Sequence, residues 1–335
     1  MKIIVDAFGG DNAPLEILRG CAEAVAEYGF EIVLVGKKDE IKRVAKENNI
    51  FLYKMTIIDA PDVIGMDEKP TEIMKSKINS SMAVGIKSLA AGEGDVFVSA
   101  GNSGALAVGA TMIAKRIKGI KRCAFAPVMP KNKGCFMLID SGANVDCRPE
   151  MLKQFGIMGS IYMEKVMKIE NPRVGLANVG VEEHKGGEFQ KDTYKLLKDS
   201  PINFIGNVEA RDIPDDGADV IVTDGFTGNI ILKLFEGVAL TLMGKVKEVF
   251  SKNAKTKLAG AIVLPEMKEL KNSIDYDEFG GAPIMGVAKP VFKIHGNAKD
   301  RAVKNALRLA AAYAEANVIE EITKYMSTQD IQSEE

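Results

Sequence analysis

The sequence is poor in the side chains from which metal sites and disulfides are built. Its 335 residues include no tryptophan, 2 histidines and 4 cysteines. No cysteine pair has the two-residue spacing of a zinc knuckle or a redox dithiol, and so few histidines exclude a multi-histidine metal site. We therefore expect no metal and no cofactor, and the thiols are typical of a reduced, cytoplasmic protein.

An excess of charge of either sign is also missing. The 44 Lys and Arg residues nearly balance the 46 Asp and Glu residues, which leaves a net charge of −2. Because nonspecific affinity for nucleic acid rests on excess positive charge, we expect no nucleic-acid partner. The apolar run from Leu258 to Leu264 is far shorter than the about 20 residues of a spanning helix, and the first residues lack the pattern of a signal peptide. We expect a soluble, cytoplasmic protein that can still touch a membrane surface.

Motifs for nucleotides and for a nucleophilic serine are absent as well. There is no G-x-G-x-x-G fingerprint and no G-x-x-x-x-G-K-S/T loop. The segment from Gly101 to Ala105 lacks the second glycine of the G-x-S-x-G turn. The sequence thus disfavours dinucleotide chemistry, P-loop hydrolysis and a serine hydrolase.

What the chain does have is a regular alternation of short β-branched runs and longer amphipathic stretches. Strands separated by helical patterns predict an α/β fold with a mostly parallel sheet and helices on both faces. Ligands of such sheets lie at the carboxyl ends of the strands, so the loops that follow the strands are the candidate site. The predicted strands are Ile3–Val5, Ile32–Val35, Thr56–Asp59, Val96–Ser99, Phe136–Asp140, Val174–Asn178, Asn203–Gly206 and Val220–Thr223.

The pattern changes in the last third of the chain. Residues 234–271 combine a broad apolar stripe with many lysines, which indicates a helical excursion from the sheet. A final helix is expected from Lys299 to Met326, and the polar residues 327–335 are expected to fray. We assign residues 1–326 to a single α/β domain.

Two segments of the chain resemble each other. Residues 95–104 and 219–228 both fit Asp-Val-x-Val-(Ser/Thr)-x-Gly-x-(Ser/Thr)-Gly, which suggests two similar strand-loop-helix units in one sheet. Backbone N–H groups at a helix start, together with a hydroxyl, bind phosphate without much positive charge. Alternatively, the similarity only reflects the Gly and Ser content of tight turns. The anion-binding candidates are Ser99, Gly101, Ser103, Gly104, Asp224, Gly225, Thr227 and Gly228, with Asn102 and Asn229 as side-chain donors.

The loop after the first strand supplies further candidates. Gly9 and Gly10 would let a ligand approach the backbone. Asp6 and Asp11 can orient a base or a cation, although Asp11 is equally suited to cap the next helix.

Cationic side chains complete the candidate set. Lys185 can neutralise a phosphate or an oxyanion, or is simply solvated. His295 precedes the final helix, and a histidine there is either structural or a proton donor. The basic cluster from Lys115 to Arg122 offsets a helix dipole or meets an acidic protein partner.

Taken together, these loops resemble the phosphate acyltransferase family of bacterial phospholipid synthesis, PlsX, along almost the whole chain. The resemblance implies a three-layer α/β/α, Rossmann-like fold similar to phosphotransacetylase and the isopropylmalate dehydrogenases. It also implies a homodimer that transfers a fatty acyl group from acyl carrier protein to inorganic phosphate, for use by a membrane glycerol-3-phosphate acyltransferase. The matching stretches are Asp6–Asp11, Ser99–Ala105, Gly206–Glu209, Val222–Asn229 and Gly281–Pro283.

This activity fits the candidate residues, because phosphate is itself the nucleophile and no covalent intermediate is needed. Ser103 and Thr227 would hold phosphate, Asn102 and Asn229 would donate hydrogen bonds, and Lys185 or His295 would stabilise charge or transfer a proton. Residues 234–271 would form the dimer interface and touch an anionic membrane, or would be an ordinary dimer helix pair. A phosphotransacetylase acting on acyl-coenzyme A and a noncatalytic scaffold that binds acyl carrier protein at the membrane are the alternatives.

Overall fold

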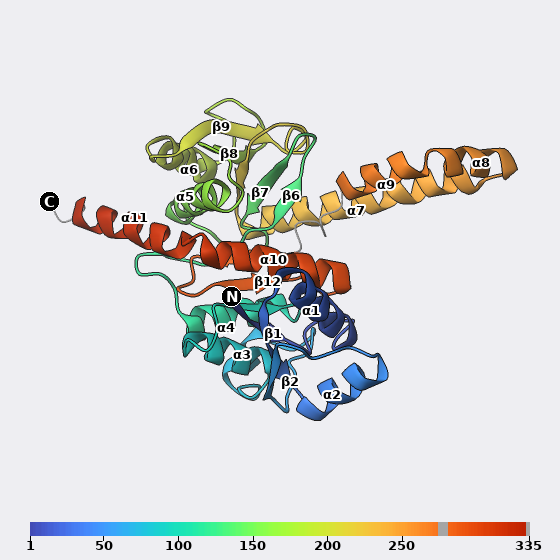
Figure 1. Ribbon diagram of the computed structural model, residues 1–335. Coiled ribbons are helices and arrows are strands. Elements are labelled where there is room, and N and C mark those ends of the chain that lie inside the picture. Colours follow the sequence, from blue (N-terminus) through green and yellow to red (C-terminus); the bar gives the residue numbers. More distant parts are fainter. Residues whose placement is uncertain (274–280, 333–335) are drawn as a thin grey trace.

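Parallel pairing of the short apolar strands builds two sheets in the computed structural model, which describes residues 1–273 and 281–332 (Figure 1). Each predicted strand is present. The 7-stranded sheet has the order β3-β2-β1-β4-β12-β11-β5, and β11 runs antiparallel to both of its neighbours. Its strands are β1 (Lys2–Asp6), β2 (Glu31–Gly36), β3 (Met55–Asp59), β4 (Val96–Ser99), β5 (Ala124–Phe125), β11 (Ala282–Met285) and β12 (Val291–Lys293).

The second sheet is formed by the middle of the chain. It is 5-stranded, in the order β6-β7-β10-β8-β9, and only β6 is antiparallel to its neighbour. The expectation that the two similar loop units share one sheet is therefore wrong, because β4 lies in the first sheet and β10 in the second. The repeated sequence specifies a turn between a strand and a helix, but not which strands become neighbours. The strands are β6 (Val128–Pro130), β7 (Cys135–Ile139), β8 (Arg173–Asn178), β9 (Asn203–Glu209) and β10 (Val220–Val222).

Helices cover both faces of each sheet, as predicted. In the first half, α1 (Leu15–Tyr28), α2 (Lys38–Glu47) and α10 (Asp300–Glu315) share one apolar core with the sheet. A second core on the other face includes α3 (Ser81–Ala90), α4 (Ser103–Gly109), the short 3₁₀ helix η1 (Pro70–Met74) and the π-helical turn η2 (Ala110–Ala114). In the second half, α5 (Pro149–Lys165) and α6 (Glu188–Lys198) pack on one face, and the start of α7 packs on the other.

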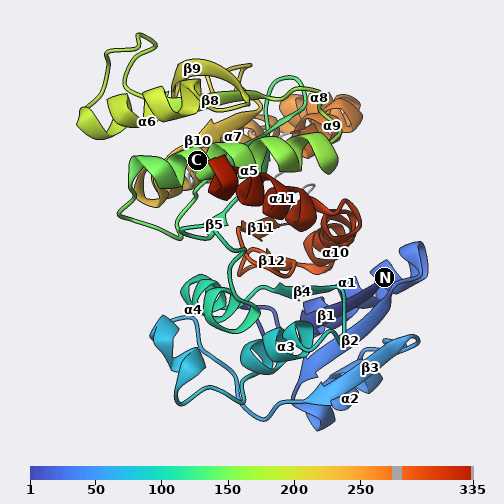
Figure 2. The same cartoon turned by 90° about the vertical axis from the view of Figure 1, so that its left-hand side faces the viewer.

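One continuous core joins the two halves, with β12, α10 and α11 (Val318–Gln332) between them (Figure 2). The rings of Tyr162 on α5 and Tyr313 on α10 are 5.6 Å apart, and Phe292 on β12 lies 5.8 Å from Tyr313. Burying such large rings is strongly favourable, so the halves are held together by apolar contact. The assignment of residues 1–326 to a single domain stays a prediction.

A long helical arm leaves the second sheet, which confirms the predicted excursion (Figure 1). It consists of α7 (Gly225–Ser251), α8 (Ala254–Ile262) and α9 (Leu264–Ser273). By length and composition alone α7 would suffice to cross a membrane, a test that long helices of soluble proteins also pass.

The last helix differs from the prediction in two ways. The expected continuous helix is broken between α10 and α11, where Asn317 adopts a φ of 53°. The helix α11 extends to Gln332, and residues 333–335 lie outside the described part of the chain, so the fraying of residues 327–335 stays a prediction.

The arm is fixed at its base by Gly228. A Cβ atom there would overlap the backbone carbonyl of Asp140, whereas a Cβ atom on Gly237, further along α7, would meet nothing within 4 Å. We expect Gly228→Ala to lower the free energy of unfolding by about 1–3 kcal/mol through overpacking. The matched change Gly237→Ala should raise it by about 0.5–1 kcal/mol, because alanine is the better helix former. Urea denaturation measures both, and equal effects would contradict this packing.

Candidate active site

The candidate site is a cleft of about 440 Å³ that is lined by residues from both halves of the protein. The first half contributes Ser103 at the start of α4 and the segment from Lys293 to Asn297 after β12. The second half contributes Ser141 after β7 and one face of α7. The strands β4, β7 and β12 end at this cleft, as expected for a parallel α/β protein.

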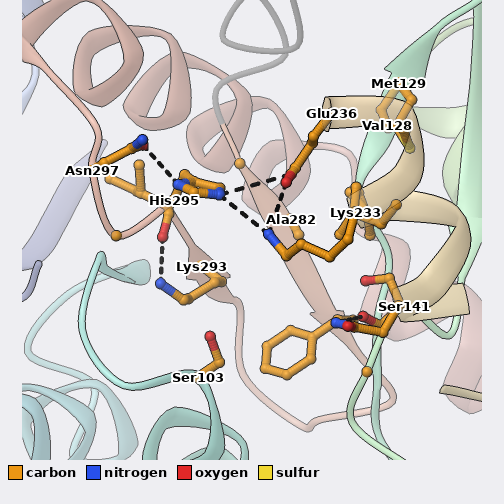
Figure 3. A pocket seen from close by; sticks show the side chains of 18 of the residues that line it. Ser103, Val128, Met129, Ser141, Lys233, Glu236, Ala282, Lys293, His295 and Asn297 are labelled. Atoms are coloured by element: carbon orange, nitrogen blue, oxygen red, sulfur yellow. Dashed lines mark hydrogen bonds and ion pairs between the residues drawn. The ribbon is translucent and has the colours of Figure 1, made fainter. Parts of the chain in front are cut away.

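One side of the cleft carries a cluster of charged groups (Figure 3). The Lys233 ammonium donates to the Glu236 carboxylate at 2.8 Å, and Nε2 of His295 lies 3.7 Å from that carboxylate and 3.5 Å from Lys233 Nζ. The other ring nitrogen, Nδ1, is 2.7 Å from Oδ1 of Asn297, which makes Nδ1 the donor there. In that tautomer Nε2 is the accepting nitrogen of the ring, and it faces the Lys233 ammonium.

Lys293 lies close to Ser103 in the same cleft (Figure 3). Its ammonium donates to the carbonyl of Ala100 at 3.0 Å and to that of Ile294, so one N–H remains for a ligand. Burial lowers the pKa of Lys293 to about 8, an effect that Lys233 reinforces and the carboxylates of Asp6 and Asp11 oppose.

The part of the cleft formed by β6 is an apolar wall that lies beside Glu236 and Lys233 of α7. Val128 and Met129 of β6 lie across the cleft from Lys293 and Ser103 (Figure 3). This wall can take a hydrocarbon chain, while the charged side can take an anion. Other apolar residues that line the cleft are Met66, Phe125, Pro127, Leu232, Ala282 and Ile294.

Asp140 fixes the loop on which Ser141 stands. Its buried carboxylate accepts hydrogen bonds from the backbone N–H groups of Phe125, Gly142, Ala143 and Asn144 and from the Asn144 amide. Burial raises the pKa of Asp140 although these donors oppose the rise. The loop in turn receives α7, since the N–H of Gly225 donates to the carbonyl of Asn144 at 2.7 Å.

Some predicted site residues do meet in the cleft, namely Asp11, Ser103, Asn229 and His295. Sequence reasoning missed Lys233, Glu236 and Lys293. Lys233 and Glu236 could have been predicted, because they follow Asn229 at successive spacings of four and three residues and so lie on the same face of a helix. Lys293 stands two residues before His295 at a strand end, where alternate side chains share a side.

Asn102 is not a substrate donor but a structural side chain. Its Oδ1 accepts from the N–H of Ala105 as the N-cap of α4, and its amide donates to the carbonyls of Gly65, Met66 and Glu68 at 2.9–3.1 Å. No amide hydrogen is left for a ligand.

The first-strand loop is likewise held by its own contacts. Ser99 donates to the buried Asp6 carboxylate at 2.7 Å and accepts from the N–H of Gly101, and a Cβ atom on Gly9 would collide with that nitrogen. Burial raises the pKa of Asp6, although hydrogen bonds from Ser81 and Ser99 oppose the rise. Asp6, Gly9, Ser99 and Gly101 thus position two loops against each other and are not among the described residues that line the cleft.

Gly10 and Gly104 also serve close packing. Gly10 has a φ of 93°, which favours glycine, and a Cβ atom on it would meet the carbonyl of Gly296 at 2.7 Å. A Cβ atom on Gly104 would meet Pro70 of η1.

The second repeated loop differs from the first in its cap. Asp224 caps α7, accepting from the N–H of Thr227 at 2.9 Å and from its hydroxyl at 2.8 Å. Its carboxylate occupies the helix start and repels an anion, and the Thr227 hydroxyl is already donated. Gly225 and Gly228 are closed off by Asn144 and Asp140. These contacts disfavour phosphate at this loop, and its role in binding phosphate stays a prediction.

Lys185 lies apart from this cluster. It is in the loop after β8, 3.8 Å from the carboxylate of Glu182, and does not belong to the described lining of the cleft. A chemical role for Lys185 stays a prediction. Within residues 1–273 and 281–332, no group of three or more His, Cys, Asp and Glu side chains is placed to hold a metal ion.

Solved structures with this fold define its class. A phosphotransacetylase from Streptococcus pyogenes aligns over 94% of both chains with a TM-score of 0.64 at 16% identity. A branched-chain phosphotransacylase from Enterococcus faecalis aligns over 94% of this chain and 99% of its own with a TM-score of 0.58 at 14% identity. At such identities the likeness establishes the fold alone, which confirms the predicted Rossmann-like α/β class.

Sequence relatives go further. Residues 1–321 match the model of the family described as fatty acid synthesis protein. The phosphate acyltransferase of Alkaliphilus oremlandii is 45% identical over 98% of both chains, and that of Acetivibrio thermocellus is 45% identical over 100% of both. The chain is an enzyme of the acyltransferase class, and it belongs to the phosphate acyltransferase family, as its motifs predicted.

Proposed function

We propose that this enzyme transfers a fatty acyl group from the thioester of acyl carrier protein to inorganic phosphate, and so supplies acyl phosphate for phospholipid synthesis. The observation that carries the proposal is the cleft, which brings two lysines, a histidine and an apolar wall together in a chain of the phosphate acyltransferase family. Phosphate and a fatty acyl chain need these two environments side by side.

Phosphate is best placed between Lys293 and Ser103. Lys293 has a donor to spare, and the Ser103 hydroxyl is exposed to the cleft at the start of α4. The cap of α4 is the neutral Asn102, so that helix start attracts an anion, in contrast to the Asp224-capped start of α7. Lys233 adds positive charge to the same cleft.

The reaction then needs positioning and one proton transfer. An oxygen of HPO₄²⁻ attacks the thioester carbonyl carbon, and Asn229 and Lys233 face the oxyanion that develops. The C–S bond breaks, and the hydrogen of the phosphate ends on the departing sulfur by way of Nε2 of His295. The Glu236 carboxylate, 3.7 Å from Nε2, can pair with the imidazolium that forms in between.

The experiment that tests this function measures free thiol and acyl phosphate from acyl carrier protein and coenzyme A thioesters, each with and without phosphate. We expect phosphate-dependent release from the carrier-protein donor. A strong preference for coenzyme A would favour the phosphotransacetylase alternative. No release from either donor would contradict an enzymatic role and favour the scaffold.

Asn229 should matter for rate more than for folding. Asn229→Ala removes a donor from the cleft and should lower turnover about 100-fold to 1000-fold, the usual effect of losing one oxyanion donor. Asn229 donates to the backbone carbonyl of Ser141 at 3.2 Å. The control is Asn203→Ala, because Asn203 likewise donates to a backbone carbonyl, that of Asn171, but stands at the start of β9 and outside the cleft. Wild-type turnover by a folded Asn229→Ala enzyme would remove Asn229 from the mechanism.

The pH dependence should report Lys293. Because its pKa in the free enzyme is about 8, the ammonium that binds phosphate is lost as the pH rises above that value. We expect kcat/KM for phosphate to fall about tenfold per pH unit on this limb, and Lys293→Met to abolish the limb together with most of the activity. A flat profile between pH 7 and about 9.5 would show that Lys293 does not carry the charge that matters.

We further propose that the enzyme is a cytoplasmic homodimer attached to the anionic membrane surface by its arm, where a membrane glycerol-3-phosphate acyltransferase takes up its product. Leu234, Val238 and Leu242 of α7 are more than half exposed, a stripe that suits a second copy of the chain. At the tip, Leu258 and Ile262 are 66% and 70% exposed, and lysines flank them. Apolar insertion combined with basic attraction is what surface binding requires.

Flotation with anionic liposomes tests the membrane contact. The double change Leu258→Glu and Ile262→Glu should abolish co-flotation. The control Phe51→Glu and Tyr53→Glu adds the same charge at side chains that are 84% and 71% exposed far from the arm, and should leave it intact. Equal flotation of both variants would contradict a membrane contact at the tip of the arm, and only the role in the dimer would remain.

A further inference from the structure

A second cavity, of about 460 Å³, lies beside the cleft. We call it the arginine cavity, since Arg116 and Arg122 stand at its edge. Its walls include Thr111 and Met112 of η2 and the loop from Ala143 to Asp146. None of these residues has a part in the acyl transfer described above.

The arginine cavity and the cleft are lined by the same three elements. On the chain from α4 to η2, Ser103 lines the cleft and Ala107, one turn later, lines the arginine cavity. The loop after β7 gives Gly142 to the cleft and Ala143 to the arginine cavity. At β5 the order along the chain is reversed, since Cys123 lines the arginine cavity and Phe125 lines the cleft. The two spaces therefore lie next to each other, and we call the two together the groove.

Positive charge is concentrated at the end of the groove that contains the arginine cavity. The segment from Lys115 to Arg122 holds two arginines and three lysines with no acidic residue between them, and all of these side chains are exposed. Within the described part of the chain, none of them makes an ion pair with a carboxylate. Asp146 is the only acid among the described residues that line the arginine cavity, so two guanidinium groups outweigh it.

The basic segment is held rigidly. The N–H of Ile117 donates to the carbonyl of Gly286 at 3.0 Å, and that of Lys121 donates to the side chain of Gln154, which itself donates to the carbonyl of Gly119. Arg116 donates to the carbonyl of Lys121, which orients its guanidinium. A binding site built on fixed groups loses less entropy on binding than a flexible basic loop.

We infer that the arginine cavity holds the phosphodiester of the 4′-phosphopantetheine arm of the acyl carrier protein, an inference that rests on the proposed function. The arm is a long chain with a thioester at one end and a phosphodiester at the other, and this groove has a reactive cleft at one end and two arginines at the other. Guanidinium groups bind phosphate oxygens by paired, charge-assisted hydrogen bonds. Met112 and Val145, 60% and 64% exposed, provide apolar contacts beside them.

The partner at the mouth of the groove is the acidic carrier protein itself. Lys118 and Lys121 are exposed on the same rigid segment but do not line the arginine cavity, so they face outward. Complementary charge of this kind speeds and orients the docking of an acidic surface.

The test compares the double variant Arg116→Gln, Arg122→Gln with the matched control Arg43→Gln, Arg211→Gln, whose guanidinium groups are exposed in α2 and after β9. Each is assayed with three donors, namely acyl carrier protein, acyl-4′-phosphopantetheine and acyl-pantetheine, which lacks the phosphate. We expect the double variant to raise KM about tenfold or more for the first two donors. KM for inorganic phosphate and the rate with acyl-pantetheine should not change, and the control should behave as the wild type.

An equal loss with acyl-pantetheine would overturn the inference, because the arginines would then not recognise the phosphodiester. So would a loss confined to the carrier protein, which would place them against its surface. Binding of carrier protein with and without its arm is measured in parallel, and the double variant should lose only the preference for the armed form. A wild-type enzyme that binds the armed carrier but releases no thiol would contradict the proposed function and leave the subsite in place.

Discussion

The buried carboxylate of Asp140 is the contact on which the rest of the site depends. By gathering N–H groups from Phe125 and from residues 142–144, it fixes the loop that lines both the cleft and the arginine cavity. The same loop accepts the first turn of α7, with Gly228 against the Asp140 carbonyl. Because α7 brings Asn229, Lys233 and Glu236 into the cleft and continues into the arm, the cleft and the arm share one helix. Removing a partner from such a buried, multiply bonded group is costly.

A single capping residue distinguishes the two loops that look alike in the sequence. Asn102 caps α4 with a neutral amide, and Asp224 caps α7 with a carboxylate. Both side chains accept a hydrogen bond from a backbone N–H of the first helical turn. Only the neutral Asn102 leaves a helix N-terminus that attracts an anion. In the proposed site, a chain of net charge −2 would bind phosphate through the positions of Lys293 and Lys233 and not through its total charge.

The sequence was sufficient for the strands, the helical arm and the family, because these rest on local periodicity and on motifs at strand ends. It was not sufficient for the division into two sheets. The chain passes from the first sheet to the second between Phe125 and Val128, and no sequence pattern there indicates the change. Asn102 and Thr227 were assigned to the ligand because free and committed polar groups look the same in a sequence. Lys293 was overlooked because the sequence does not show that this lysine is buried. Its burial, which lowers its pKa, arises only from the packing of β12.

The central claim is that phosphate binds between Lys293 and Ser103, beside the apolar wall. Crystals soaked in inorganic phosphate test it most directly. We expect an anion within hydrogen-bonding distance of Lys293 Nζ and Ser103 Oγ in wild-type crystals, and none there in Lys293→Met crystals. An anion at the start of α7, beside Asp224 and Thr227, or one that persists at Ser103 without Lys293, would contradict it.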